Sequence, residues 1–533
     1  MARGVIFEDE HLLVMNKPAG MNTHAPDPHA GEGLHEWLKH REPRWADLAI
    51  LHRLDKGTSG VLVFGKTPVA NRSLGEQFTA HTIRKKYHLL TDRVVPSGRI
   101  HTVSALVRAG EKYLNRPLHA GAERAETGFK SLGPWEGRVL VEAEPVTGRT
   151  HQIRVHAAAE GFPIVGDILY GGTPAPRIFL HALELRLRHP ATHEEIAFTA
   201  PADFNADPRL ALREMLVEPG MTGGETTAYR LVHGAADGRP GWYVDRLGDY
   251  LLSQGGEPLA PRQRADLARL MNHCQARGAY HKLLHRQPGR SGPQLASPEF
   301  VLGEAAPDTF AIWENGVRYE LSFKEGYSVG LFLDQRDNRR RFLTNHVAAR
   351  FPPFPGGMAG REVLNTFAYT CGFSVTAAKA GARVTSLDLS RKYLDWGTRN
   401  FALNGLDAGA HEFIHGDVFE WLRRLGKKGR QFQAIVLDPP TFSHSKEHGA
   451  FQAEKDYGQL ALAALPLLAP GGVLLASTNA ARLEPTKFLA SLQSAIQTSR
   501  RRILQQHYVP QPPDFPVHRE EPAYLKTVWL RVS

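Results

Sequence analysis

The first candidate for chemistry near the start of the chain is an aspartate in a turn-forming segment. Residues 51–60 read LHRLDKGTSG, so Asp55 stands two residues after Arg53 and just before a run of Gly, Thr and Ser. An opposite charge beside a carboxylate keeps it ionised, and an ionised Asp can act as a nucleophile or as a general base. Because Asp is also a common turn residue, the residue types alone leave both roles open.

Two later segments carry side chains that could work with this aspartate. Residues 85–90 read KKYHLL and contain Tyr87, and residues 146–156 read VTGRTHQIRVH and contain Arg154. A tyrosine ring can stack on a nucleobase, and arginine pairs readily with a carboxylate. A single tyrosine in a strand is also compatible with an ordinary core position.

Acidic residues recur at the ends of strand-like runs in the last third of the chain. Asp388 lies in VTSLDLS, Asp417 in HGDVF, and Asp438 in AIVLDPPTFS. Asp388 comes 23 residues after Asn365, roughly where a nucleoside-binding doubly wound fold places the acid that holds the ribose hydroxyls. Only Gly372 stands in the intervening loop, so a purely structural βαβ unit fits this pattern equally well.

Across roughly residues 5–201, several motifs resemble the RluA-type family of RNA pseudouridine synthases. The motifs are NKPAG, HRLDKGTSG, KKY, TGRTHQIRVH, GDILYG and LHA, and they occur in the order and spacing of that family. The resemblance implies an isomerase that breaks the glycosidic bond of uridine, turns the base and rejoins it through carbon. It implies no cofactor for this reaction.

The same resemblance implies a role for each of four residues. Asp55 would be the catalytic carboxylate and Arg154 its partner, Tyr87 would stack on the target base, and Arg53 would fill the space left by the extruded nucleotide. Extrusion is expected because an enzyme cannot reach a base inside a stacked helix. Whether Asp55 attacks the sugar or removes a proton from it stays open.

The last third resembles class I S-adenosylmethionine methyltransferases, and most closely large-subunit rRNA methyltransferases of the RlmI/RlmK type. The resemblance rests on GLFLDQRDNRR, NTFAYT, LDLSRKYLDWGTRNFALNGL and LDPPTF. It implies S-adenosylmethionine as cofactor. It implies a cofactor site made of Asp334, Gln335, Arg336, Asn365, Phe367, Gly372, Asp388, Asp417, Val418 and Asp438, with the target base against Pro439, Pro440 and Phe442.

The acceptor atom can be argued from the cysteines. Methylation of carbon 5 of cytosine requires a cysteine nucleophile, which in such relatives follows the fifth strand. The corresponding segment here, VLLASTNAARL, has none, and the chain contains only Cys274 and Cys371. A ring nitrogen needs only to be positioned beside the sulfonium. We therefore favour guanine N7, with 5-cytosine as the alternative.

These motifs require a multidomain chain. At 533 residues, several domains are expected. We predict an α+β synthase domain with a mixed, largely antiparallel sheet over 1–200, a linker over 201–224, and a small central α/β domain over 225–325. A doubly wound, Rossmann-like α/β methyltransferase should follow over 326–533, with strands near 362–365, 383–388, 411–415, 434–438 and 472–477.

Charge favours a polyanionic partner. The net charge is +10, and residues 331–533 hold 26 Lys and Arg against 17 Asp and Glu. Basic clusters at 339–341, 427–430 and 500–502 are candidate phosphate contacts, although such runs are often merely solvated faces. We expect RNA, specifically large-subunit rRNA, as partner, and neither DNA nor a membrane.

Two cysteines and the absence of a signal-like or membrane-spanning stretch favour a cytoplasmic protein. The histidines show no metal-site spacing, so no metal is expected. Competing hypotheses are an RNA-binding or assembly factor in which one site has decayed, and a small-molecule methyltransferase. The oligomeric state and the modified positions do not follow from the sequence.

Overall fold

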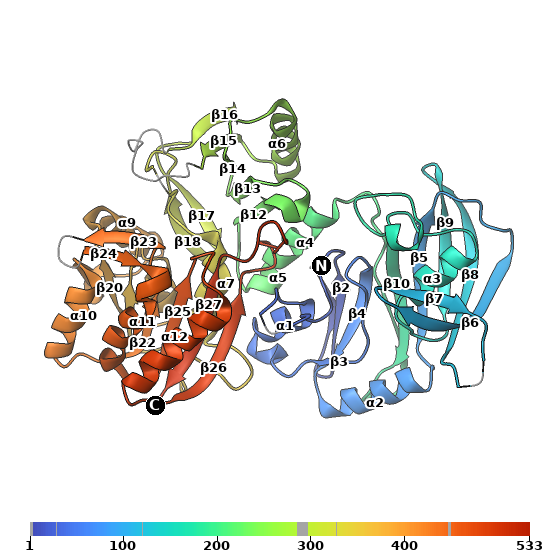
Figure 1. The fold of residues 1–533 in the computed structure, drawn as a ribbon, viewed down its shortest axis with the longest axis horizontal. Helices are drawn as coiled ribbons and strands as arrows, with labels where there is room; N and C mark the ends of the chain where they lie inside the picture. Colours follow the sequence, from blue (N-terminus) through green and yellow to red (C-terminus); the bar gives the residue numbers. More distant parts are fainter. Residues whose placement is uncertain (1–3, 28, 120, 285–296, 327, 446–448) are drawn as a thin grey trace. The chain divides into compact units, whose positions relative to one another are not determined.

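The computed structural model describes residues 4–27, 29–119, 121–284, 297–326, 328–445 and 449–533 (Figure 1). The chain divides into two compact units. Unit 1 comprises Met1–Pro26, Gly33–Glu36 and Asp47–Met221, and unit 2 comprises Asp27–Glu32, Trp37–Ala46 and Thr222–Ser533. The short stretch Trp37–Ala46 therefore belongs to unit 2, although most of the chain around it belongs to unit 1.

Unit 1 is built on one mixed sheet with the strand order β1-β2-β4-β10-β5-β9-β8-β6-β7, to which β3 and β11 are added. Among the described strands, neighbours are antiparallel except β4 and β10. This confirms the expected α+β domain. The strands are β1 (Val5–Glu8), β2 (Leu12–Lys17), β3 (Ala49–Ile50), β4 (Ser59–Gly65), β5 (Arg84–Thr91), β6 (Arg99–Ala109), β7 (Lys112–Arg116), β8 (Arg124–Trp135), β9 (Arg138–Pro145), β10 (Leu180–Arg188) and β11 (Glu195–Thr199).

Helices of the N-terminal part pack on this sheet or lead away from it. α2 (Pro68–Thr79) begins where Thr67 accepts a hydrogen bond from the amide of Ala70, as a helix cap should. α3 (Gln152–Ala159) packs against β7, β8 and β9. The stretch expected as a linker contains two helices, α4 (Pro208–Val217) and α5 (Pro219–Thr222). α1 spans Leu34–Lys39.

The parallel pairing of β4 with β10 depends on a glycine. Gly60 has φ +114°, and a Cβ atom there would lie 2.2 Å from the carbonyl oxygen of Ala182 on β10. Gly60 is paired with Ala182 in the sheet register. Only glycine permits both this conformation and this close approach. The loop that carries Asp55 enters β4 directly before this point.

Unit 2 contains a doubly wound sheet with the order β21-β20-β19-β22-β25-β27-β26, parallel except where β27 pairs with β25 and β26. The order reverses between β19 and β22, which places a ligand crevice at their carboxyl ends. The expected strands are present. The strands are β19 (Glu362–Thr366), β20 (Arg383–Asp388), β21 (Glu412–His415), β22 (Phe432–Leu437), β25 (Leu468–Thr478), β26 (Ile503–Pro510) and β27 (Lys526–Val532).

Helices cover both faces of this sheet (Figure 1). Successive strand residues therefore enter two different cores: Val363 lies in one and Leu364 in the other, as expected for strands buried on both faces. The helices of this part are α7 (Arg336–Thr344), α8 (Gly372–Lys379), α9 (Arg391–Leu403), α10 (Val418–Lys427), α11 (Ala453–Ala464) and α12 (Pro485–Thr498). A small hairpin pairs β23 (Phe442–Ser445) with β24 (Gly449–Gln452).

The central part forms a second sheet, β12-β13-β14-β15-β16, with α6 (Pro261–Cys274). Its core is continuous with that of the methyltransferase-like part, since Leu252 and Tyr280 belong to the same buried cluster as Val363 and Phe342. The strands are β12 (Ala228–His233), β13 (Trp242–Leu247), β14 (Tyr250–Gly255), β15 (Gly278–Leu283) and β16 (Glu299–Gly303), followed by the hairpin β17 (Phe310–Glu314) and β18 (Val317–Leu321).

None of the helices in the described ranges combines the length and the apolar character that crossing a membrane requires.

We expect Gly60→Ala to destabilise unit 1, because the strained φ alone costs about 1–3 kcal/mol and the new methyl group meets a backbone oxygen. Gly75 is the matched control. It lies inside α2 with nothing within 4 Å of an added Cβ, so Gly75→Ala should stabilise the helix by up to about 1 kcal/mol. Urea denaturation of both variants measures the difference, and equal midpoints would contradict the role given to Gly60.

Candidate active sites

Asp55 lies in the loop between β3 and β4, where the neighbouring backbone is fixed from both sides. The hydroxyl of Thr23 donates to the carbonyl of Leu54 at 2.8 Å and accepts from its amide at 3.1 Å. The amide of Thr58 donates to the carbonyl of Asp55 at 3.0 Å. The carboxylate is therefore presented from a rigid turn.

Arg154 joins Asp55 to a second, buried carboxylate. From α3, its Nη1 donates to Oδ2 of Asp55 at 3.1 Å. Its Nε and Nη2 form a bidentate pair with Asp167 at 2.7 and 2.8 Å. Asp167 is only 1% exposed. A bidentate pair fixes the plane of a guanidinium, so Asp167 aims the remaining nitrogen of Arg154 at Asp55.

Asp55 and Arg154 line a cavity of about 870 Å³, and the expected Tyr87 and Arg53 line it as well. Burial, together with the charge of Asp55, raises the pKa of the Tyr87 hydroxyl, so the ring faces the cavity in its neutral form. Arg53 is exposed at the cavity. The structure thus brings together all four residues that the sequence singled out in this part.

Lys17 is a residue of this site that the sequence reasoning did not name. It is fully buried, and its Nζ donates to the carbonyls of Pro18, Met21 and Lys56 at 2.9, 2.7 and 3.4 Å. Burial lowers its pKa to about 7. Lys17 ties the NKPAG loop to the loop that carries Asp55. Its place inside NKPAG was the available signal.

The second site is a cavity of about 310 Å³ at the carboxyl ends of the parallel strands of unit 2. Of the expected residues it contains Asp334, Gln335, Phe367, Asp388, Asp417, Val418, Asp438, Pro439 and Pro440. Further lining residues are Phe332, Tyr369, Leu389, Tyr393, Phe419, Ser443, Gly449, Phe451, Asn479 and Leu525.

Asp388 sits at the end of β20 and is held by backbone amides. Its Oδ1 accepts from the amide of Ser390 and its Oδ2 from the amide of Tyr369, both at 2.8 Å. Burial raises its pKa. The loop before α8 alternates into the left-handed region at Phe367, Tyr369 and Cys371, with φ of 53°, 48° and 63°. Such strain is typical of ligand-binding turns.

Two further acids, Asp334 and Asp438, interact at the carboxyl end of β22. Gln335 donates through Nε2 to Asp438 at 3.1 Å and to the hydroxyl of Ser477 at 2.7 Å. Burial and the neighbouring charge of Asp334 raise the pKa of Asp438 to about 7. Tyr524 donates to Asp334 at 3.0 Å. At neutral pH, Asp438 is therefore poised to exchange a proton or to respond to a nearby positive charge.

Four of the expected residues lie elsewhere. Arg336 is fully buried and pairs with Asp514 at 2.8 Å through both terminal nitrogens, because helix α7 turns this side chain toward the C-terminal loop. Asn365 on β19 donates to the buried hydroxyl of Ser374 on α8. Gly372 opens α8 and, like Asn365, is absent from the cavity lining. Phe442 is 58% exposed on β23, whereas the next residue, Ser443, lines the cavity.

Most of the basic residues described in the expected phosphate-binding clusters contact the protein itself. Arg339, Arg340 and Arg341 are each at most 4% exposed. Arg339 pairs with Glu314 and Arg340 with Glu42, so these arginines hold the fold instead of facing RNA. In the third cluster, Arg501 donates to backbone carbonyls. Lys427 and Lys428 in the second cluster are exposed.

Aromatic residues that the sequence reasoning missed form one wall of the second cavity. The rings of Phe332 and Tyr369 lie 5.4 Å apart, and those of Tyr369 and Tyr393 lie 4.6 Å apart. Tyr369 stands in the NTFAYT motif, which offered a signal. Tyr393 stands in the LDLSRKYLDWGTRNFALNGL motif and offered a similar signal, whereas Phe451 comes from the β24 hairpin strand and offered none. Within the described residues, no group of His, Cys, Asp and Glu is arranged to hold a metal ion.

Comparisons with known proteins find matches in two parts of the chain. Residues 11–159 match the family model for RNA pseudouridylate synthase, and residues 262–531, about half of the chain, match the model for S-adenosylmethionine-dependent methyltransferase. A ribosomal RNA large subunit methyltransferase of Deinococcus radiodurans is 34% identical over 335 residues, which cover 61% of this chain and 78% of that protein.

Two other matches cover different parts. Ribosomal RNA large subunit methyltransferase I of Aeromonas hydrophila is 35% identical over 318 residues, covering 57% of this chain and 75% of that protein. The structure of human RNA pseudouridylate synthase domain containing 4 is 26% identical with a TM-score of 0.31, covering 39% of this chain and 93% of that chain. The chain belongs to the S-adenosylmethionine-dependent methyltransferase family and carries an RNA pseudouridylate synthase domain in its N-terminal part.

Proposed function

We propose that this enzyme modifies large-subunit ribosomal RNA twice, converting a uridine to pseudouridine and methylating a second base, guanine, at N7. The observation that carries the proposal is the pair of carboxylate-centred cavities, one in each unit. The names of the relatives, which are ribosomal RNA large subunit methyltransferases, support rRNA as the substrate. Cytoplasmic location, where rRNA modification would occur, remains a prediction.

In the synthase part, Asp55 acts on the nucleotide and the surrounding side chains keep it ready. Arg154, aimed by Asp167, donates a hydrogen bond to the Asp55 carboxylate and fixes its position in the cavity. Tyr87 offers a neutral ring on which a flipped uracil can stack, and Arg53 at the cavity can take the place of the extruded nucleotide. Such extrusion makes the base accessible.

The crevice of unit 2 fits a nucleoside cofactor. Asp388 and Asp417 stand at the ends of adjacent strands and are suited to ribose hydroxyls and an adenine edge, while Val418 and Phe419 add apolar surface. Asp334, Gln335 and Phe367 would border the same ligand. S-adenosylmethionine supplies a methyl group on a sulfonium when bound. Asp438, Pro439 and Pro440 are left to hold the target base.

The acceptor atom is argued from the thiols. Cys371, the last residue of the loop before α8, is fully buried, and Cys274 is buried at the end of α6. Neither lines the cavity, where Asn479 occupies the segment after β25 and accepts a hydrogen bond from Thr441 at 2.7 Å. Carbon methylation of cytosine would need a thiolate there. A guanine nitrogen needs only orientation, and Asp438 can stabilise the positive charge that develops on the ring.

We expect Asp55→Asn to lower pseudouridine formation by at least about 100-fold, because the reacting carboxylate is lost. Primer extension after carbodiimide treatment of the RNA measures it. Asp47→Asn, which changes an exposed aspartate nearby, should form pseudouridine at the normal rate. Methyl transfer should be unchanged in both variants. Normal pseudouridine formation by Asp55→Asn would sink the proposal for this site.

The methylated atom can be identified directly. Nucleoside mass spectrometry of rRNA treated with the enzyme should reveal 7-methylguanosine. RNA containing 5-fluorocytidine should form no covalent complex, since no cysteine is available to attack the ring. Cys274→Ala should leave methyl transfer unchanged. A 5-methylcytidine product or a trapped complex would establish the alternative.

The rate of methyl transfer should rise with pH through about 7 and level off above it. Asp438, whose pKa is raised to about 7, is neutral below that pH and negatively charged above it, and only the charged form stabilises a cationic ring. Asp438→Asn should remove this inflection and lower the plateau about tenfold or more. Single-turnover rates between pH 5.5 and 8.5 measure it, and an unchanged profile in the variant would contradict the role.

A further inference from the structure

Helix α7 begins directly after the turn that lines the second cavity. The turn Leu333–Gln335 is a short 3-10 helix, and its Asp334 and Gln335 both line the cavity, as does Phe332 just before it. Because Arg336 is the first residue of α7, any shift of the amino end of α7 moves these three cavity residues with it.

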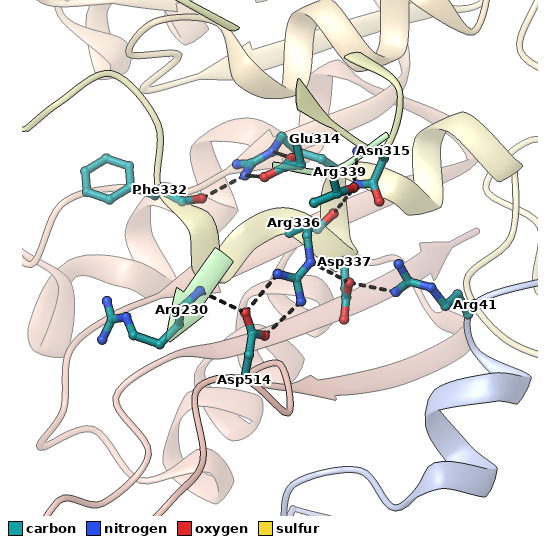
Figure 2. Close-up of polar contacts among 10 residues, drawn as sticks. Arg41, Arg230, Glu314, Asn315, Phe332, Arg336, Asp337, Arg339 and Asp514 are labelled. Carbon is teal, nitrogen blue, oxygen red and sulfur yellow. Dashed lines mark hydrogen bonds and ion pairs between the residues drawn. The ribbon is translucent and has the colours of Figure 1, made fainter. Parts of the chain in front are cut away.

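Buried ion pairs hold this end of the helix (Figure 2). Arg336 makes a bidentate pair with Asp514, whose side chain is also fully buried. Arg339, one turn later, pairs with Glu314 at 2.6 and 2.7 Å and also donates to the carbonyl of Phe332 at 2.8 Å. Bidentate pairs are directional, so these contacts define where the turn at 333–335 sits.

A third ion pair at α7 comes from far away in the sequence. Arg41, in the stretch Trp37–Ala46 that unit 2 takes from the N-terminal chain, donates through Nη1 to Oδ1 of Asp337 at 2.9 Å (Figure 2). Its guanidinium also lies over the ring of Trp37, 4.6 Å from the centroid. Arg41 is 4% exposed, so the pair is shielded from solvent.

Neighbouring residues of the same stretch contact α7 and the turn after it. Glu42 pairs with Arg340, and the carbonyl of Lys39 bonds Nε2 of His346 at 2.8 Å. The stretch Trp37–Ala46 therefore follows the helix from its first turn to beyond its end. It lies inside the region that matches the RNA pseudouridylate synthase family model.

Asp337 contacts two arginines, so loss of Arg41 would affect the contacts of the other one, Arg336. Oδ1 of Asp337 is 2.9 Å from Arg41 and 3.5 Å from Nε of Arg336. If Arg41 were absent, the partly buried carboxylate would turn to Arg336 for compensation. It would then compete with Asp514 for that guanidinium and pull on the first turn of α7.

We propose that Arg41 is a positioning residue for methyl transfer: by neutralising Asp337, a residue from the synthase part of the chain keeps Asp334 and Gln335 in place in the cofactor cavity. The proposal rests on the proposed use of this cavity by S-adenosylmethionine. It makes the methyltransferase dependent on a segment of the synthase region, without any shared substrate.

The test uses the full chain with Arg41→Met. S-adenosylmethionine binding, measured by calorimetry, should weaken about tenfold, within the usual range of coupling between sites, while pseudouridine formation stays within about twofold. Arg41→Lys keeps the charge but not the planar fork, so its affinity for S-adenosylmethionine should lie between that of the unchanged protein and that of Arg41→Met. If Arg41→Met fails to fold, Arg41→Lys takes its place in the test. Lys39→Ala, which leaves the backbone contact to His346 intact, is the matched control.

A double variant separates positioning from mere loss of stability. In Arg41→Met with Asp337→Asn, no carboxylate remains to compete for Arg336, so cofactor affinity should recover most of the loss. Additive losses in the double variant, or unchanged affinity in Arg41→Met and Arg41→Lys, would overturn the proposal. Asp388→Ala tests the cavity itself: if it leaves cofactor binding intact, the proposed function of the cavity fails, whatever the Arg41 variants do.

Discussion

A carboxylate that is taken out of water needs an opposite charge nearby to stay ionised, and this constraint shapes both candidate active sites. Asp167, Glu314 and Asp514 are each almost completely buried, and each faces an arginine that binds it through two nitrogens. Removing one partner of such a pair costs about 3–5 kcal/mol. The acids that are left with weaker compensation are Asp55, which is proposed to react with the nucleotide, and Asp438, which is proposed to stabilise charge on the target base.

The same constraint explains why local sequence predicted some site residues and not others. Asp388, Asp417 and Asp438 follow strands whose apolar character is visible over a few residues, and parallel strands bring their carboxyl ends to one edge. Arg336 belongs to an equally distinctive motif, but its direction depends on Asp514, 178 positions away. No local pattern reveals such a partner, and the clustered arginines at 339–341 misled for the same reason.

Prediction of the domain boundaries was limited because packing between distant segments is not visible in the sequence. The sequence predicted a small central α/β domain over 225–325, but Leu252 and Tyr280 pack into the same buried cluster as Val363 and Phe342, which only the tertiary structure reveals. In unit 1, Asp55, Arg154 and Tyr87 came from motif order. Lys17 and Asp167 were missed because their role is to hold backbone and guanidinium groups, not to face a substrate.

The seclusion of the α7 arginines has a practical consequence for handling the enzyme. Ions in solution screen exposed charges within about 10 Å at 0.1 M salt, yet they scarcely reach pairs with no solvent-accessible surface. Attraction between RNA phosphates and exposed basic side chains weakens steeply with ionic strength. Moderate salt should therefore strip bound RNA from the protein during purification while the internal scaffold of its C-terminal unit stays intact.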